Sequence, residues 1–284
     1  MYLANVDFDA LIREDVPYFD LTAFELGLNH EPARIACFTR EDCIVCGTEE
    51  AREVFRRLGI ETLHMIDSGT TAHAGDELIV GTGESTEVLT AWKVIQNLID
   101  HTSGVATKTK RFADAAHAVN PNLAILTTRK MFSGTKALMI KAVMAGGAVP
   151  HRLGLSETIL VFSQHINLLG GFQRLLEKLP EMKHSCCEKK ILVETSNLEK
   201  ALSCLRAGAD GIQLEKLTPE ELNNICSEIR KEFPQAVLLS AGGINETNVS
   251  NYAAADINGI VTTSLYTAKP VDVGVRIQPA SADK

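Results

Sequence analysis

The sequence predicts a protein of the α/β class, with an amino-terminal α+β layer followed by a closed or nearly closed β/α barrel. From residue 123 onward, short apolar and β-branched runs alternate with helical stretches, which is typical of a parallel sheet covered on both faces. About seven such runs are present, close to the eight strands of a complete barrel. A chain of 284 residues, 45% apolar and 23% charged, can also bury a full core.

The first hundred residues mix helices and strands. Helical periodicity predicts a short helix that Pro17 ends, and a second helix whose shared apolar face carries Ala51, Val54 and Phe55. A third helix begins with a capped entry at residues 84–87 and is expected to be interrupted at Gly104. Strands are expected at residues 33–38, 43–47, 62–66 and 77–81.

The barrel elements follow in strict alternation. Strands are expected near residues 123–127, 147–150, 157–162, 191–195, 211–215, 236–240 and 259–263. The intervening helices are expected at residues 134–145, 167–178, 197–207, 218–232 and 246–254. The polar stretch 181–190 is interpreted as a surface loop, and alternating valines after residue 269 predict a terminal strand that can return to the first layer.

Three of the predicted barrel strands end in basic side chains: Arg129 and Lys130, His151 and Arg152, and His165. Because active sites of β/α arrays lie on loops at the carboxyl ends of the strands, we expect these side chains to share one site. An arginine can hold a carboxylate or phosphate through two donors, and a lysine adds a compact charge. The sequence therefore predicts an anion cradle, with ordinary solvated loop charges as the alternative.

Carboxylates and small residues follow the later strands. Glu194 and Glu215 end consecutive strands, where they can hold a divalent metal, accept ribose hydroxyls, stabilise a cationic sugar-like transition state, or merely pair with nearby cations. The last two strands end in small residues, where barrels commonly hold phosphate: Ala241, Gly242, Gly243, Thr262, Thr263 and Ser264. A tight turn alone is the alternative for the glycine pair. The combination predicts a phosphosugar that reacts with an acidic partner.

Composition restricts the environment and the partners. The net charge of −8 argues against nucleic acid or an anionic membrane, since both need a basic footprint. No apolar run approaches the ~20 residues of a membrane span, and no secretion signal is recognised. We expect a cytoplasmic protein whose seven cysteines are free thiols. Cys43 and Cys46 have metal-like spacing, but no second pair accompanies them.

Ordered motifs along nearly the whole chain resemble a known family. They are Ser103-Gly104-Val105-Ala106-Thr107, Thr128-Arg129-Lys130, Gly146-Gly147, His151-Arg152-Leu153-Gly154-Leu155, Val193-Glu194 and Gly242-Gly243-Ile244. These motifs are similar to those of the quinolinate phosphoribosyltransferases, also called nicotinate-nucleotide pyrophosphorylases. The stretch 153–164, with Cys46-Gly47 and Ala91-Trp92-Lys93, is closer to the ModD-type branch, pyrophosphorylases associated with molybdenum transport.

The resemblance implies an amino-terminal α/β sandwich domain, residues 1–104 joined by the terminal strand 269–284, and an incomplete (β/α) TIM-like barrel, residues 105–268. It implies a pentosyltransferase that moves phosphoribose from phosphoribosyl pyrophosphate to the ring nitrogen of a pyridine dicarboxylate, with Mg²⁺ and with decarboxylation. It also implies an obligate homodimer in which each active site is shared between the subunits.

The motif positions assign a role to each candidate residue. The catalytic residues would be Lys130, Glu194 and Glu215, and the two glutamates would also hold magnesium. Substrate would be bound by Lys93, Arg129, His151, Arg152, Phe162, His165 and Lys216. The 5′-phosphate would be bound by Ala241, Gly242, Gly243, Thr262 and Thr263.

Several positions depart from the family pattern. Lys93 stands where the family has an arginine donated by the partner subunit, Phe162 where it has a lysine, and Glu215-Lys216 where it has Asp-Asn. We therefore expect a phosphoribosyltransferase whose acceptor is a small nitrogen heterocycle other than quinolinate. Two alternatives stay open: a non-catalytic phosphosugar-binding sensor near molybdate uptake, and a barrel aldolase with Lys130 or Lys216 as Schiff-base amine.

Overall fold

The computed structural model of the protein describes residues 6–28 and 30–280 and divides into two compact units. Among the described residues, the first unit holds 6–28, 30–110, 131–147 and 266–280, and the second holds 111–130 and 148–265. Residues 131–147 were expected with the barrel. Their contacts group them with the first unit, where the buried Lys141 of helix α5 (Lys136–Ala145) is bonded to Glu49 and Glu50. Residues 281–284 of the expected terminal strand lie outside the described residues.

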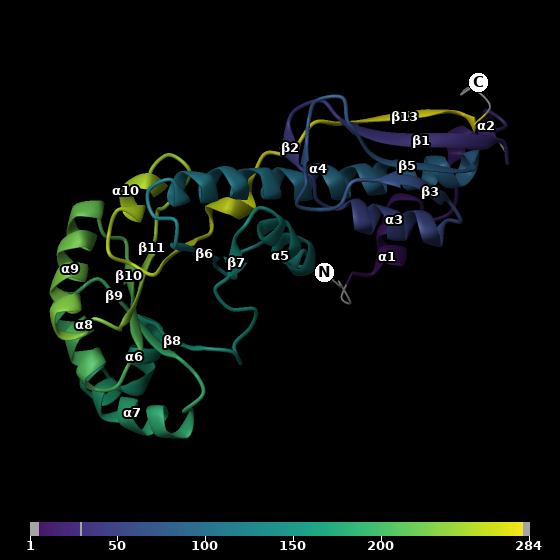
Figure 1. The fold of residues 1–284 in the computed structure, drawn as a ribbon. Coiled ribbons are helices and arrows are strands. Elements are labelled where there is room, and N and C mark those ends of the chain that lie inside the picture. Colours follow the sequence, from purple (N-terminus) through teal and green to yellow (C-terminus); the bar gives the residue numbers. More distant parts are fainter. Residues whose placement is uncertain (1–5, 29, 281–284) are drawn as a thin grey trace. The chain divides into compact units, whose positions relative to one another are not determined.

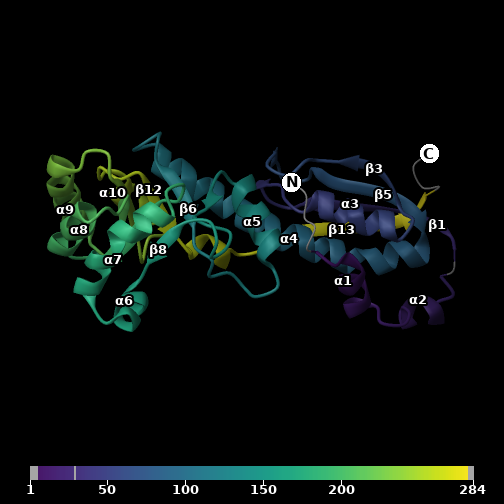
Figure 2. The same cartoon turned by 90° about the horizontal axis from the view of Figure 1, so that it is seen from below.

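The first unit is an α/β sandwich (Figures 1 and 2). Its antiparallel sheet has the order β13-β1-β5-β3, so the last strand pairs with the first, Ile277 opposite Ile35. Apolar residues of the sheet pack against helices, with Phe55, Ile95 and Ile99 fully buried. The elements are α1 (Phe8–Asp15), α2 (Leu21–Glu25), β1 (Pro32–Thr39), β2 (Cys43–Ile44), α3 (Thr48–Arg57), β3 (Glu61–Met65), β4 (Thr71–Ala72), β5 (Glu77–Glu84), α4 (Ser85–His117) and β13 (Val273–Pro279).

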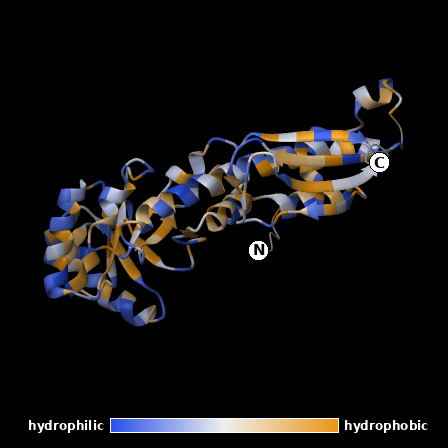
Figure 3. Cartoon of the chain, turned by 45° about the horizontal axis from the view of Figure 1, so that its top comes forward, coloured by the Kyte–Doolittle hydropathy of each residue, from blue (hydrophilic) through white to orange (hydrophobic). Residues whose placement is uncertain are grey.

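The second unit is an incomplete β/α barrel. Seven parallel strands lie in the order β7-β6-β12-β11-β10-β9-β8, and the open edges are β7 and β8. Helices cover the outside of these strands (Figure 1). The strands are largely apolar, and the helices carry the hydrophilic residues (Figure 3). The elements are β6 (Ala124–Thr127), β7 (Val149–Pro150), β8 (Ile159–Val161), α6 (Ser163–Leu169), α7 (Phe172–Ser185), β9 (Ile191–Thr195), α8 (Leu198–Arg206), β10 (Gly211–Glu215), α9 (Pro219–Glu232), β11 (Val237–Ala241), α10 (Val249–Ala253), β12 (Gly259–Thr262) and the 3₁₀ turn η1 (Ser264–Thr267).

The expected interruption at Gly104 was wrong: α4 runs unbroken from Ser85 to His117. Gly104 serves packing instead, since a Cβ there would lie 2.3 Å from the carbonyl oxygen of Lys269. The helix therefore continues while the chain near residue 269 crosses it closely. Among the described helices, none is long and apolar enough to cross a membrane.

The expected single helix at 167–178 is in fact two helices. Gly170 and Gly171 both have positive φ, 98° and 112°, which ends α6 and starts α7. Helix α7 then continues to Ser185, so the expected loop 181–190 is helical over its first half. Two adjacent glycines with positive φ thus set the turn between α6 and α7.

Candidate active site

A pocket of about 610 Å³ opens in the second unit, at the carboxyl ends of the parallel strands. Each strand of the sheet, or the loop that follows it, contributes at least one residue to the pocket lining. The lining is Thr127, Thr128, Arg129, Lys130, His151, Arg152, Leu160, Phe162, Glu194, Gln213, Glu215, Lys216, Ala241, Gly242, Gly243, Ile244, Asn245, Val261, Thr262, Thr263 and Ser264. Arg129, Lys130, His151 and Arg152, which follow two of the predicted strands, thus line the same pocket, whereas His165 is not part of its lining.

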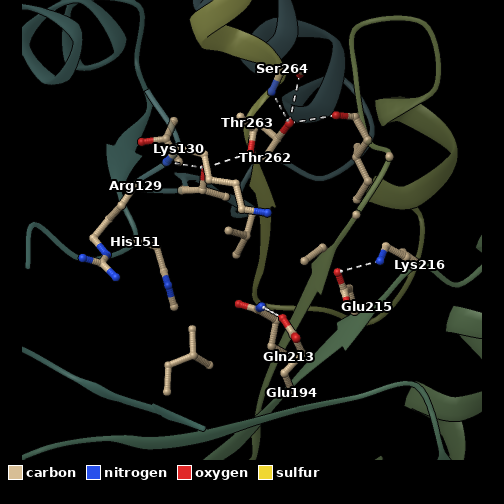
Figure 4. A pocket seen from close by; sticks show the side chains of 18 of the residues that line it. Arg129, Lys130, His151, Glu194, Gln213, Glu215, Lys216, Thr262, Thr263 and Ser264 are labelled. Atoms are coloured by element: carbon tan, nitrogen blue, oxygen red, sulfur yellow. Dashed lines mark hydrogen bonds and ion pairs between the residues drawn. The ribbon is translucent and has the colours of Figure 1, made fainter. Parts of the chain in front are cut away.

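One side of the pocket is basic, with Arg129, Lys130 and His151 reaching into it (Figure 4). Arg152 is only 9% exposed, so it is no solvated loop charge, and its Nη1 donates to the carbonyl oxygen of Thr158 at 3.5 Å. Burial and then the charge of Arg129 lower the pKa of Arg152. Burial and then Arg152 also lower the pKa of His151, so that imidazole is neutral at pH 7. A neutral imidazole can both donate and accept a hydrogen bond.

The opposite side holds the two carboxylates (Figure 4). Burial, followed by repulsion from Glu215, raises the pKa of Glu194. The Nε2 of Gln213 donates to Glu194 Oε2 at 2.6 Å, and the Lys216 ammonium lies 3.4 Å from Glu215 Oε1. Gln213 was not among the residues expected from the sequence, although a buried polar residue inside an otherwise apolar strand is a recognisable signal.

Small residues after β11 and β12 form the third part of the pocket. Gly242 and Gly243 both have positive φ, 90° and 76°, so the turn needs glycine. The hydroxyl of Thr262 donates to the carbonyl oxygen of Ile244 at 2.8 Å and accepts from the backbone N–H of Ser264 at 3.0 Å. These bonds tie the two strand ends together. The turn thus offers a backbone cradle of the kind that accommodates phosphate.

Phe162 lies between the apolar interior and the basic side. Its ring packs against the buried cluster of Leu160 and the neighbouring strands, and the guanidinium carbon of Arg152 lies 5.9 Å from the ring centre. His165 stacks on Phe162 but does not line the pocket. Lys93 lies on α4 in the first unit, where its Nζ donates to Gln96 Oε1. The pocket therefore brings together every candidate site residue except Lys93 and His165.

The two carboxylates suit a magnesium ion whose other ligands come from the substrate. Across residues 6–28 and 30–280, no group of three or more His, Cys, Asp or Glu side chains is arranged to hold a metal ion. Mg²⁺ commonly uses only one or two protein carboxylates and takes its other ligands from phosphates and water. Glu194 and Glu215 fit that pattern.

Cys43 and Cys46 are free and buried, and burial raises the pKa of Cys46 to about 11, so its thiol is not activated.

The anion clamp, the carboxylate pair and the glycine cradle lie together at the carboxyl ends of the barrel strands. This arrangement is typical of barrel enzymes that act on phosphorylated substrates. Residues 105–276 match the family model of the quinolinate phosphoribosyl transferase C-terminal domain, and residues 18–103 match that of the N-terminal domain. The chain belongs to this family, and it is therefore a pentosyltransferase.

Individual relatives support this family assignment. The chain is 37% identical over 241 residues to "Putative pyrophosphorylase ModD" of Rhodobacter capsulatus, covering 85% of this chain and 92% of that protein. It is 28% identical over 274 residues to a "Probable nicotinate-nucleotide pyrophosphorylase [carboxylating]" of Methanothermobacter thermautotrophicus, covering 94% and 96%. The fold matches the nicotinate-nucleotide pyrophosphorylase structure from Francisella tularensis with a TM-score of 0.86 at 24% identity, covering 98% and 99%.

Proposed function

We propose that the protein transfers phosphoribose from phosphoribosyl pyrophosphate to a ring nitrogen of a small heterocycle. The bond between ribose C1 and the pyrophosphate oxygen breaks, the C1–N bond forms, and pyrophosphate leaves. The observation that carries this is the composition of one pocket, in which the glycine cradle and two carboxylates face a basic clamp. Membership of a phosphoribosyltransferase family supports the same reaction.

Each part of the pocket suits one part of the reaction. Backbone amides at Gly242 and Gly243 would bind the 5′-phosphate, and Glu194 and Glu215 would hold the ribose hydroxyls. Magnesium on the two glutamates would neutralise charge on the leaving pyrophosphate. Lys130, whose charge acts on Glu194 across the pocket, would also meet the pyrophosphate or the acceptor acid.

The acceptor end suits a single carboxylate. Arg129 and the buried Arg152 can hold one carboxylate with charge-assisted bonds, and neutral His151 can bond an uncharged ring edge. A second carboxylate would meet Phe162, which carries no charge. We therefore propose a heteroaromatic monocarboxylate, or a ring with an uncharged edge, rather than quinolinate.

We also propose a cytoplasmic homodimer that shares its active sites, with Lys93 donated by the partner subunit. Support comes from the family resemblance and from Lys93 itself, which is an exposed lysine on α4. The likeness to proteins named ModD supports a role beside molybdenum uptake.

The deciding experiment combines binding with product release. Phosphoribosyl pyrophosphate with magnesium should stabilise the protein by ~2.7 kcal/mol at a hundredfold excess over the dissociation constant. Pyrophosphate should then appear when a suitable acceptor is added. Binding without release, for every heterocyclic monocarboxylate tried, would favour the sensor alternative, and an unmoved melting curve would remove phosphoribosyl chemistry. Borohydride trapping of Lys130 or Lys216 with a carbonyl compound would favour the aldolase.

A further inference from the structure

Lys216, in the loop after β10, has a left-handed backbone conformation that lysine rarely adopts. Its φ is 57°, and His30 is the only other non-glycine residue with positive φ among those the structure describes. Such a conformation is unfavourable for an L residue with a Cβ and persists only where the surroundings impose it. At functional sites this kind of strain often serves to position a side chain.

The surroundings of Lys216 hold the loop at both ends. The backbone N–H of Lys216 donates to the carbonyl oxygen of Ala241 at 2.8 Å, which ties it to the neighbouring strand. The hydroxyl of Tyr252 donates to the carbonyl oxygen of Leu217 at 3.0 Å, and Thr218 caps helix α9. The lysine is therefore fixed in place by its backbone, independently of its side chain.

The stem of Lys216 crosses the glycine cradle. A Cβ added to Gly242 would lie 2.7 Å from Lys216 Cγ and 3.0 Å from its backbone nitrogen. Gly242 is thus needed both for its own positive φ and for the space that the lysine occupies. The lysine stem therefore lies against the cradle, and its ammonium lies beside Glu215.

That ammonium acts on the carboxylate pair. Its Nζ lies 3.4 Å from Glu215 Oε1, an ion pair that Figure 4 shows beside the pocket. Glu194 and Glu215 line the same pocket, so the Lys216 ammonium lies beside the carboxylate pair. Because the Lys216 side chain is 76% exposed, the pair contributes little to folding and can open when a ligand enters.

We propose that Lys216 is a built-in counter-ion of the Glu194–Glu215 pair. Its ammonium competes with a divalent metal for these carboxylates and contacts the phosphorylated sugar directly. The inference rests on the proposed function for the identity of that sugar. The ammonium supplies part of the positive charge that a metal would bring, so the site binds divalent ions weakly and retains affinity for the pyrophosphate-bearing sugar without them. With metal and substrate bound, Glu194 and Glu215 would hold the metal, and the Lys216 ammonium would contact the pyrophosphate oxygens instead of Glu215.

The test compares Lys216→Asn and Lys216→Gly with wild type, since both replacements tolerate positive φ and lack the ammonium. Lys231→Asn is the matched control, because Lys231 is an exposed lysine on α9 paired with Glu228. Mn²⁺ binding is measured on the full chain without sugar. Removing a positive charge close to the metal should tighten Mn²⁺ binding roughly three- to tenfold in both Lys216 variants, and the control should match wild type.

A second measurement is the affinity for phosphoribosyl pyrophosphate in the presence of a chelator, where both Lys216 variants should bind about tenfold more weakly than wild type. Mn²⁺ affinity that is unchanged or weaker in the variants overturns the inference, as does the absence of Mn²⁺ binding in all proteins. If wild type binds no phosphoribosyl pyrophosphate with or without metal, the proposed function fails, while the Mn²⁺ measurement still judges the role of Lys216.

Discussion

His165 holds Phe162 in place through two contacts. The backbone N–H of Phe162 donates to Nδ1 of His165 at 2.9 Å, and the two rings stack with centroids 5.8 Å apart and planes inclined by 28°. Accepting this bond requires a lone pair on Nδ1, so in this arrangement the ring N–H is at Nε2. His165 therefore orients a pocket residue although it does not line the pocket itself.

The first prediction is that Phe162→Lys raises kcat/KM for quinolinate by roughly thirtyfold or more. The reason is that a desolvated carboxylate without a cationic partner loses ~2–5 kcal/mol of binding free energy. Steady-state kinetics with quinolinate as acceptor measures the effect. The control is Tyr18→Lys, which adds the same charge at a side chain that is 91% exposed in the first unit. A variant no better than wild type would mean that the second carboxylate binds elsewhere.

Most of the candidate site was predictable because parallel strands end at one edge of a sheet. Arg129, Glu194 and Gly242 could be assigned from strand positions alone, since each strand is a distinct apolar run. The conformation of Lys216 could not, because its positive φ is imposed by bonds from distant residues. The helix interruption predicted at Gly104 was wrong for a similar reason. The glycine allows residue 269 to approach closely, which no local sequence pattern reveals.

The second prediction concerns subunits. If Lys93 completes the partner's site, mixing Lys93→Ala chains with Arg129→Ala chains should restore about a quarter of wild-type activity, because half of the randomly formed dimers then carry one intact site. Activity is measured after unfolding and refolding the mixture. Mixing Arg129→Ala with His151→Ala chains is the control and should restore nothing, since both residues line the same pocket of one chain. Equal activity in both mixtures contradicts a shared site.

The third prediction concerns the buried ion cluster of the first unit. Lys141 Nζ lies 2.7 Å from Glu49 Oε2 and 2.5 Å from Glu50 Oε2, and Lys141 and Glu50 are almost fully buried. Replacing Lys141 with Met should lower the free energy of unfolding by ~3–5 kcal/mol, because Glu50 is left buried without a counter-charge. Denaturant titration measures the loss, and adding Glu50→Gln should recover part of it.

The control for Lys141 is Lys178→Met on α7. Lys178 pairs with Glu181, but both side chains are exposed, so the loss should be only ~0–1 kcal/mol. Similar losses at both lysines would show that burial of the cluster does not matter to its stability.

The fourth prediction is a pH dependence that originates at Asp100 on α4. Burial, and then the negative charge of Asp272, raise the pKa of Asp100 to about 6, and its Oδ1 is buried without a hydrogen-bond partner among the described residues. The folded protein thus binds this proton more tightly than the unfolded chain, whose aspartate titrates near pH ~3.9. The stability that this proton contributes is complete below about pH 4 and is lost as the pH rises through about 6.

Asp100→Asn removes the charge that has to be buried at neutral pH. The variant should therefore match wild type at about pH 4 and exceed it at about pH 8 by on the order of 1 kcal/mol, with the difference growing through about pH 6. Melting temperatures across this range measure the difference. Asp15→Asn, at the exposed end of α1, is the control and should show no such growth. A difference between Asp100→Asn and wild type that stays constant with pH would mean that Asp100 is ionised in the folded protein throughout, with its charge stabilised by neighbouring groups.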